Sequence, residues 1–156
     1  MSLYLSEFVY GGIDGIITTF SIVAGSSGGS LLRNVILILG LSNVVSDGFS
    51  MGVSRYVSSK TEIKQGFLKE KDPTISGIVT FVSFILVGIL PLLPFIFINN
   101  NAKNNKNTTY ISLSIALVVF FSIGYLKGIV VKEKNPYKSA FEILLLGLIA
   151  SLISYT

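Results

Sequence analysis

Short polar segments divide the sequence into five long apolar stretches, and this division limits the possible folds more than any other feature. The stretches cover approximately residues 8–24, 31–57, 74–98, 108–126 and 139–155. An α-helix needs about 20 apolar residues to cross a bilayer, and only 13% of the residues are charged, about half the share of a typical soluble domain. We therefore expect an all-α membrane protein whose residues 1–156 form a single domain of five transmembrane helices.

The connections between these stretches carry two further signals. Pro91 and Pro94 lie near the end of the third stretch, and proline removes a backbone donor and clashes with the preceding helical turn. We therefore expect a kink or a broken last turn there. The second stretch is long enough to project beyond the membrane, and residues 58–73 form a short charged connector to the third.

Lysine and arginine are divided unequally between the two sides of the predicted membrane domain. The side with the N-terminus, the 58–73 connector and the loop before the fifth stretch would hold nine of the 12 basic residues: Arg55, Lys60, Lys64, Lys69, Lys71, Lys127, Lys132, Lys134 and Lys138. The other side would hold Arg33, Lys103 and Lys106. Because basic residues concentrate in short cytoplasmic loops, we expect a cytoplasmic N-terminus and connector, and a C-terminus outside the cell or in a lumen. The net charge of +4 then needs no nucleic-acid partner.

Two residue types that support much of protein chemistry are missing, because the sequence contains no cysteine and no histidine. Disulfides, thiolate ligands and cysteine nucleophiles are therefore excluded, as is the commonest proton shuttle. The serines have no histidine base, and no P-loop or dinucleotide-binding pattern is present. We expect a protein that is not an enzyme and that holds no cofactor.

Asp14 lies in the middle of the first apolar stretch, where an ionisable group is costly and is a functional candidate by default. Gly11, Gly12 and Gly15 surround it. Glycine permits local unwinding and close backbone approach, so carbonyl oxygens could join the Asp14 carboxylate as metal ligands. The alternative is a helix-packing face on which Asp14 is satisfied by a neighbouring hydroxyl or lysine.

The second stretch carries a polar stripe formed by Asn43, Asp47 and Met51, which are spaced four residues apart and therefore share one helix face. Serines border the stripe at positions 46, 50 and 54. Carboxylate and amide oxygens suit hard divalent ions, whereas a thioether favours softer transition metals. Met51 could equally be a gap-filling side chain. Gly48 and Gly52 would let another helix approach closely.

The remaining carboxylates lie near helix ends. Glu7 and Glu62 could guide cations at the cytoplasmic side, but for each alone a solvated side chain is the simpler interpretation. We expect Glu142 to have a structural role, either at the N-terminus of the fifth helix or in a pair with Lys138, and we expect Lys127 to reach the membrane interface.

Several segments resemble the vacuolar iron transporter family. The first-helix signature matches residues 14–20 and 24–25, the second-helix signature matches residues 40–43, 47–52 and 56–62, and the last two helices match residues 124–128 and 145–150. The resemblance covers nearly the whole chain and is most specific across residues 10–62. It implies a five-helix protomer that works as a homodimer. It also implies export of iron(II), and often manganese(II), from the cytosol in exchange for protons, along a path at the dimer interface lined by the first two helices.

Residue by residue, the resemblance assigns metal ligation to Asp14 and Met51. Glu62 matches the family position at the end of the second helix, which belongs to the metal-collecting site. With Asn43 and Asp47, these are the five predicted metal ligands. Asn43 stands where iron-transporting plant members have a glutamate, so Asp47, one turn further on, is the candidate for the missing charge. Relatives also insert a Glu-rich metal-collecting domain after the second helix. The 58–73 connector is too short to hold one, so the chain resembles a short form of the family.

From these residues we expect proton–metal exchange. Two protomers would bring together two copies of Asp14, Asn43, Asp47 and Met51, and four crowded carboxylates in a low dielectric cannot all stay ionised. A metal ion needs deprotonated ligands and would displace those protons, while Gly11, Gly12 and Gly15 are hinge candidates for alternating access. A non-transporting membrane scaffold, or a channel or transporter for another solute, remains an alternative. We expect the location to be a prokaryotic plasma membrane, with a vacuolar membrane as the alternative.

Overall fold

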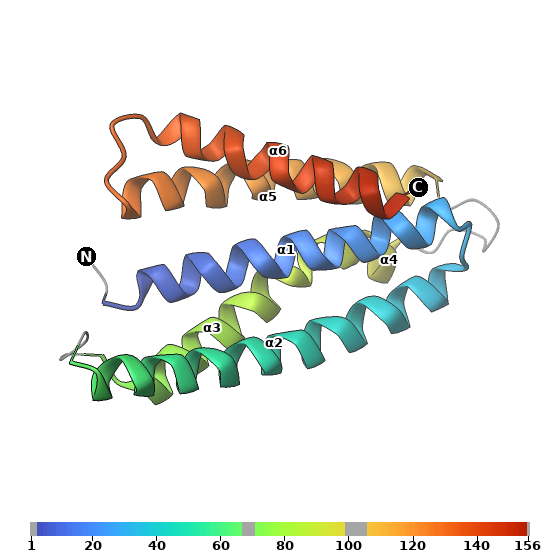
Figure 1. Cartoon of the computed structure of the whole chain (residues 1–156). Helices are drawn as coiled ribbons and strands as arrows, with labels where there is room; N and C mark the ends of the chain where they lie inside the picture. Colours follow the sequence, from blue (N-terminus) through green and yellow to red (C-terminus); the bar gives the residue numbers. More distant parts are fainter. Residues whose placement is uncertain (1–2, 67–70, 99–105, 156) are drawn as a thin grey trace.

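The computed structural model describes residues 3–66, 71–98 and 106–155, and its regular elements are helices (Figure 1). In chain order they are α1 (Leu5–Gly28), α2 (Arg33–Lys64), α3 (Pro73–Gly88), the 3₁₀ helix η1 (Leu90–Leu92), α4 (Leu93–Phe97), α5 (Lys106–Val130) and α6 (Pro136–Tyr155). Helix α1 runs through the middle of the molecule, with α5 and α6 on one side and α2 and α3 on the other (Figure 1). The predicted all-α class is confirmed for the described residues.

Among the described residues, five helical units are long and apolar enough to cross a membrane: α1, α2, α5, α6 and the unit of α3, η1 and α4 over Pro73–Phe97. Large apolar side chains point outward from them, including Ile38, Phe49, Val118 and Ile153, which are 64–70% exposed. An apolar surface of this extent is unfavourable in water, but it matches the hydrocarbon of a bilayer. The chain is therefore a multi-pass membrane protein.

The third membrane unit is broken at the predicted place. Helix α3 ends at Gly88, and η1 and α4 complete the unit around Pro91 and Pro94. Side chains of other helices donate hydrogen bonds to carbonyls of η1 and α4. Ser112 Oγ of α5 donates to the Pro91 carbonyl over 2.7 Å, and the Arg33 guanidinium of α2 donates to the carbonyls of Phe95 and Ile96. This pairing lets a broken helix persist at membrane depth.

Helix α2 is longer than its apolar stretch, because it continues to Lys64 and makes the first part of the 58–73 connector helical. Helix α3 begins after Asp72, whose side-chain oxygen accepts hydrogen bonds from the backbone N–H groups of Thr74 (2.7 Å) and Ile75 (3.3 Å). This is a helix N-cap, and the proline at the first helical position supports it.

Glycines bring α3 close to both α1 and α2. A Cβ added at Gly15 would lie 2.5 Å from the carbonyl oxygen of Phe84, and one added at Gly77 would lie 2.7 Å from the carbonyl oxygen of Gly52. Gly48 likewise faces the Phe84 side chain. The predicted close approach at Gly48 and Gly52 is therefore made by α3 of the same chain.

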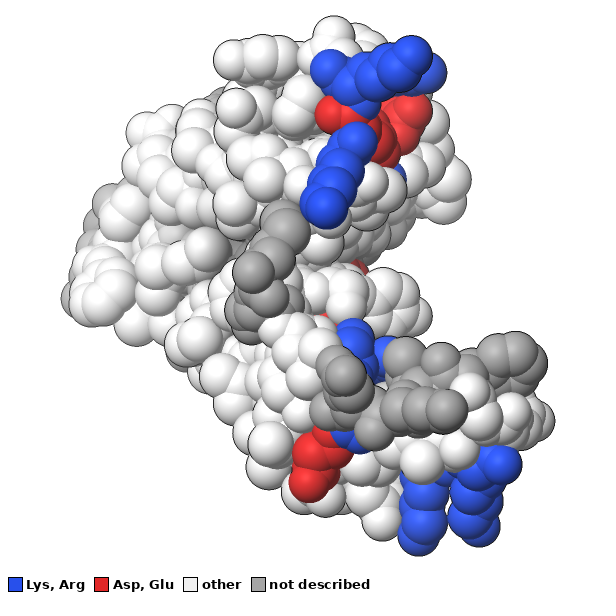
Figure 2. Space-filling model, turned by 90° about the vertical axis from the view of Figure 1, so that its left-hand side faces the viewer, with Lys and Arg blue, Asp and Glu red and all other residues white. Residues whose placement is uncertain are grey.

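Most of the described basic side chains gather at one end of the bundle, which we call the basic end, whereas Arg33 lies at the other end. The basic end holds the start of α1, the end of α2, the start of α3 and the loop between α5 and α6 (Figure 1). Figure 2 views the molecule from this end and shows blue side chains on both sides of a hollow. Lys69 and Lys103 lie outside the described residues. This asymmetry is the basis of the orientation prediction, and a cytoplasmic location for the basic end stays a prediction.

Candidate metal site between α1 and α2

Helix α1 packs closely on α3 but more loosely along α2, and two cavities lie between α1 and α2. The basic-end cavity has a volume of about 390 Å³ and is lined by Ser6, Glu7, Tyr10, Met51, Ser54, Arg55 and Ser58. The opposite-end cavity has a volume of about 460 Å³ and is lined by Ile22, Gly25, Ser26, Leu39, Ser42, Asn43 and Ser46. A polar route between the two helices would connect one end of the bundle with the other.

Asp14 and Asp47 occupy the part of α1 and α2 between the two cavities. Both side chains are half-buried. Within the described part of the chain, neither carboxylate accepts a hydrogen bond or joins an ion pair. Thr18 Oγ1 donates instead to the backbone carbonyl of Asp14, over 2.8 Å. The alternative in which a hydroxyl or a lysine satisfies Asp14 is therefore absent from this part of the structure.

The polar stripe of α2 extends from one cavity to the other. Asn43 lines the opposite-end cavity and Met51 lines the basic-end cavity, with Asp47 between them in the sequence. The side-chain nitrogen of Asn43 is buried and has no hydrogen-bond partner among the described residues. The stripe thus offers an amide, a carboxylate and a thioether beside the Asp14 carboxylate.

The described part of one protomer does not present a complete metal site. Among the described residues, no three carboxylates are grouped so that they could hold an ion together. Two carboxylates with one amide and one thioether would leave positions open on an ion that prefers six ligands. Water or a second copy of the chain would have to supply the remaining ligands.

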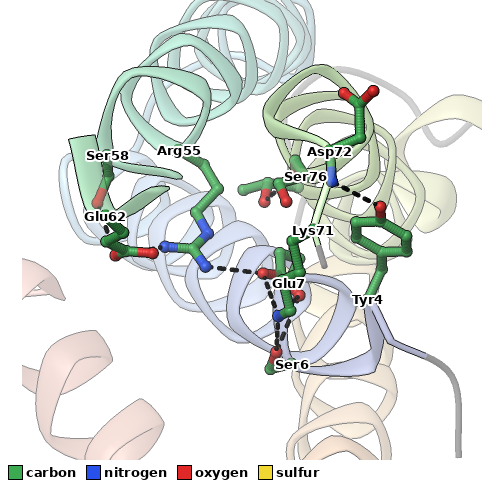
Figure 3. A network of polar contacts seen from close by, with 10 residues as sticks. Tyr4, Ser6, Glu7, Arg55, Ser58, Glu62, Lys71, Asp72 and Ser76 are labelled. Carbon is green, nitrogen blue, oxygen red and sulfur yellow. Dashed lines mark hydrogen bonds and ion pairs between the residues drawn. The ribbon is translucent and has the colours of Figure 1, made fainter. Parts of the chain in front are cut away.

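Glu7 differs from its prediction, because it is buried rather than solvated, with a relative exposure of 2%. Its carboxylate forms ion pairs with Arg55 of α2 and with Lys71 before α3, both at 2.8 Å (Figure 3). Ser6 Oγ donates to the same carboxylate over 2.8 Å. Burial of this charge is possible because two cations and a hydroxyl surround it.

Glu62, the fifth predicted metal ligand, lies in the same network and away from Asp14 and Asp47 along α2. Its Oε1 atom accepts hydrogen bonds from Arg55 over 3.2 Å and from Ser58 over 3.1 Å (Figure 3). The structure thus groups Glu62 with Glu7. The metal role of Glu62 stays a prediction.

The glycines near Asp14 lie within an unbroken helix, because α1 is continuous from Leu5 to Gly28. Gly11 and Gly15 contact the backbone of α3, and Gly12 faces the side chains of Val87 and Ile123. The expected local unwinding is absent, so the carbonyls of this segment are not freed as ligands. A hinge at these glycines stays a prediction, whereas the structure contains their contacts with α3 and α5.

Glu142 and Arg55 show what the sequence analysis missed. Glu142 Oε2 lies 3.9 Å from Lys127 Nζ, so its partner among the described residues is on α5 and is not the predicted Lys138.

The sequence analysis gives Arg55 no role in a site, although Arg55 continues the four-residue spacing of Asn43, Asp47 and Met51 on α2. That spacing was the available signal that Arg55 shares the face of the polar stripe.

Comparisons with known proteins agree with this architecture. The family model described as the VIT family matches residues 5–66 and 62–156. A protein named vacuolar iron transporter from Toxoplasma gondii is 46% identical over 59 residues, which cover 38% of this chain and 20% of the relative. The chain therefore spans about a fifth of the length of that relative.

Two plant proteins align along most of the chain. Vacuolar iron transporter 1 from Oryza sativa is 22% identical over 211 residues, which cover 96% of this chain and 82% of the relative. Vacuolar iron transporter 1 from Eucalyptus grandis is 23% identical over 211 residues, with 96% and 83% covered. Both alignments are longer than this chain of 156 residues, so these relatives contain segments that this chain lacks, as expected for a short form.

Proposed function

The chain belongs to the VIT family, and on this premise we propose that it exports divalent transition-metal ions from the cytosol in exchange for protons. The proposed cargo is iron(II) or manganese(II). The observation that supports this most directly is the pair of half-buried carboxylates, Asp14 and Asp47, which have no partner among the described residues and lie between two cavities. A carboxylate without a partner at membrane depth is costly, so such a residue is a functional candidate by default.

The ligand types support a transition metal as cargo. Asp14, Asp47 and Asn43 would supply oxygen atoms, and Met51 would supply a thioether sulfur. Oxygen alone is typical of magnesium and calcium sites, whereas sulfur shifts preference toward softer ions. We therefore propose that Met51 contributes to the discrimination against magnesium and calcium.

We further propose that the working unit is a homodimer with the path at its interface. The incomplete ligand set of one protomer supports this, because a twofold axis beside α1 and α2 would double every ligand. A hollow is visible at the basic end (Figure 2). The outer side of α2 exposes Phe49 and Val53 next to the serines of the stripe. A second copy placed there would enclose the polar stripe and shield it from lipid.

Proton exchange follows from competition for the same carboxylates. Ionised carboxylates that are close together repel each other, and a second protomer would bring two more carboxylates to Asp14 and Asp47. Protons relieve this repulsion in the empty state, and a divalent ion relieves it in the loaded state. Metal binding on one side of the membrane would therefore release protons there.

The basic end would face the cytoplasm, since it holds most of the described lysines and arginines. The ion would then enter through the basic-end cavity and leave through the opposite-end cavity. In a prokaryotic plasma membrane this direction is efflux, and in a vacuolar membrane it is storage. We propose the prokaryotic plasma membrane as the location, with the vacuolar membrane as the alternative.

Proteoliposomes containing the purified chain test this proposal. Uptake of manganese(II) is measured with an imposed pH gradient, for the wild type and for the variants Asp14→Asn and Asp47→Asn. Glu142→Gln is the matched control, because it removes a carboxylate that lies outside the α1–α2 region. We expect gradient-dependent uptake by the wild type and the control, and a loss of at least about tenfold in both aspartate variants.

Uptake that is unaffected by Asp14→Asn, or by collapse of the gradient, would contradict the mechanism. Titration calorimetry with manganese(II) separates transport from a scaffold role. A non-transporting scaffold would bind no metal, and in such a scaffold the only effect of Asp47→Asn would be weaker dimerisation.

A further inference from the structure

A chain of ion pairs lies at the basic-end cavity, which Glu7 and Arg55 line. The Arg55 guanidinium of α2 lies between two carboxylates, 2.8 Å from Glu7 Oε1 of α1 and 3.2 Å from Glu62 Oε1 of α2. Figure 3 shows Arg55 reaching from α2 toward Glu7, with Glu62 on its other side. Glu7, Arg55 and Met51 all line this cavity, and Arg55 is one helical turn from Met51. Arg55 therefore places a fixed positive charge where an incoming cation would have to pass.

Both carboxylates keep another partner if Arg55 leaves. Glu7 remains paired with Lys71 Nζ, which lies 2.8 and 3.1 Å from its two oxygens, and it still accepts from Ser6. Glu62 still accepts from Ser58 over 3.1 Å. Removing one partner of a buried ion pair is strongly unfavourable when a bare charge results. Glu7 keeps Lys71 as a cationic partner when Arg55 leaves, so no unpaired charge results at Glu7. The contact between Arg55 and Glu7 can therefore be broken.

The packing of the helices also allows Arg55 to move. Helix α1 is joined closely to α3 through Gly11 and Gly15, and Lys71, which precedes α3, holds Glu7 from that side. The contact between Arg55 and Glu7 instead crosses the looser junction of α1 and α2. The Arg55 side chain is 22% exposed, so its charged end already borders the cavity and can turn toward water.

We propose that Arg55 is a gating residue, whose ion pairs with Glu7 and Glu62 close the basic-end cavity when no metal is bound. Passage of a divalent cation toward Asp14 and Asp47 requires the guanidinium to turn away from the two carboxylates. Lys71 holds Glu7 in place during this step and keeps its charge compensated. The inference rests on the proposed function, because it identifies the gate of the proposed path.

The absence of cysteine from the chain allows a direct test of the gate. Met51→Cys provides a single thiol inside the basic-end cavity, and the full-length protein is labelled in lipid nanodiscs with an uncharged, water-soluble maleimide. An uncharged reagent avoids direct attraction or repulsion by Arg55. Removing a nearby positive charge disfavours the reactive thiolate, so faster labelling after that change reports better access.

We expect Arg55→Gln to raise the initial labelling rate of this thiol about tenfold, which corresponds to about 1.4 kcal/mol, and Arg55→Lys to leave it near the starting rate. Glu62→Gln, which removes the more exposed partner, should raise the rate as well after each rate is divided by the thiolate fraction found from its pH dependence, and it serves if Arg55→Gln fails to fold. Lys127→Gln is the matched control, because it removes a basic residue of the same end that pairs with Glu142. Equal rates with and without Arg55, or an equal rise in the control, would overturn the gate.

Labelling requires neither metal nor a pH gradient, so the two proposals can fail separately. If labelling responds to Arg55→Gln but manganese(II) uptake does not depend on Asp14, the proposed function fails while the gate remains as a conformational lock. If uptake depends on Asp14 but labelling is unchanged in the Arg55 variants, the gate fails and the proposed function remains.

Discussion

Replacing Gly15 by alanine would add one methyl group where α1 lies against the backbone of α3. The new Cβ would be 2.5 Å from the carbonyl oxygen of Phe84 and 3.1 Å from its Cα and carbonyl carbon. All three contacts are with backbone atoms, which cannot rotate away as a side chain can. One helix would therefore have to shift by several tenths of an ångström along a closely packed interface.

The expected magnitude is the balance of two effects. Overpacking of a close interface costs about 1–3 kcal/mol, and alanine returns up to about 1 kcal/mol of helix propensity relative to glycine. We expect a net destabilisation of about 1–2 kcal/mol for Gly15→Ala. At Gly12 the added Cβ would instead meet side-chain atoms of Val87 at 3.2 Å and of Ile123 at 3.4 Å, and both side chains can adjust. Gly12→Ala should therefore be close to neutral.

Helix content measured by circular dichroism at 222 nm, during unfolding in mixed micelles of increasing dodecyl sulfate, compares the two variants with the wild type. A Gly15→Ala protein as stable as Gly12→Ala would refute the packing argument. The same variants examine the hinge prediction. If Gly15→Ala retains full stability but loses manganese(II) uptake, the glycine serves motion rather than close packing.

Three further changes can be measured in the same unfolding assay. Glu7→Gln leaves Arg55 and Lys71 without their shared carboxylate and should cost about 3 kcal/mol; a change below about 1 kcal/mol would show that the network contributes little. Asp72→Ala removes the N-cap of α3 and should cost about 1 kcal/mol, whereas Asp72→Asn, which keeps an acceptor, should cost less. Lys127→Gln breaks a partly exposed pair with a 3.9 Å separation and should change stability by less than about 1 kcal/mol. A larger loss would indicate a contact beyond this pair.

The carboxylates of the α1–α2 region fall into two groups with different environments. Asp14 and Asp47 have no partner among the described residues, whereas Glu7 is surrounded by Arg55, Lys71 and Ser6. Under the proposed function the first pair would serve an exchanging ion, whereas the ion pairs of Glu7 join α1 to α2 and to the residue before α3. This division separates the proposed site of transport from its proposed gate.

The sequence alone determined the features that depend on local composition and spacing. Five apolar stretches predict five membrane helices because length and hydropathy decide insertion. Pro91 and Pro94 predict the broken helix because proline affects its own turn. Asn43, Asp47 and Met51 predict a shared face because helical spacing does not depend on neighbouring helices.

Only the tertiary structure decided which helix lies beside which face. The ion pair of Glu7 and Arg55 joins residues 48 positions apart, and nothing local distinguishes a solvated glutamate near a helix end from a buried one. The glycines near Asp14 are compatible with a flexible segment or with a close helix contact, and the position of α3 shows the contact. The same arrangement leaves Asp14 and Asp47 without partners among the described residues, and the proposed function depends on that.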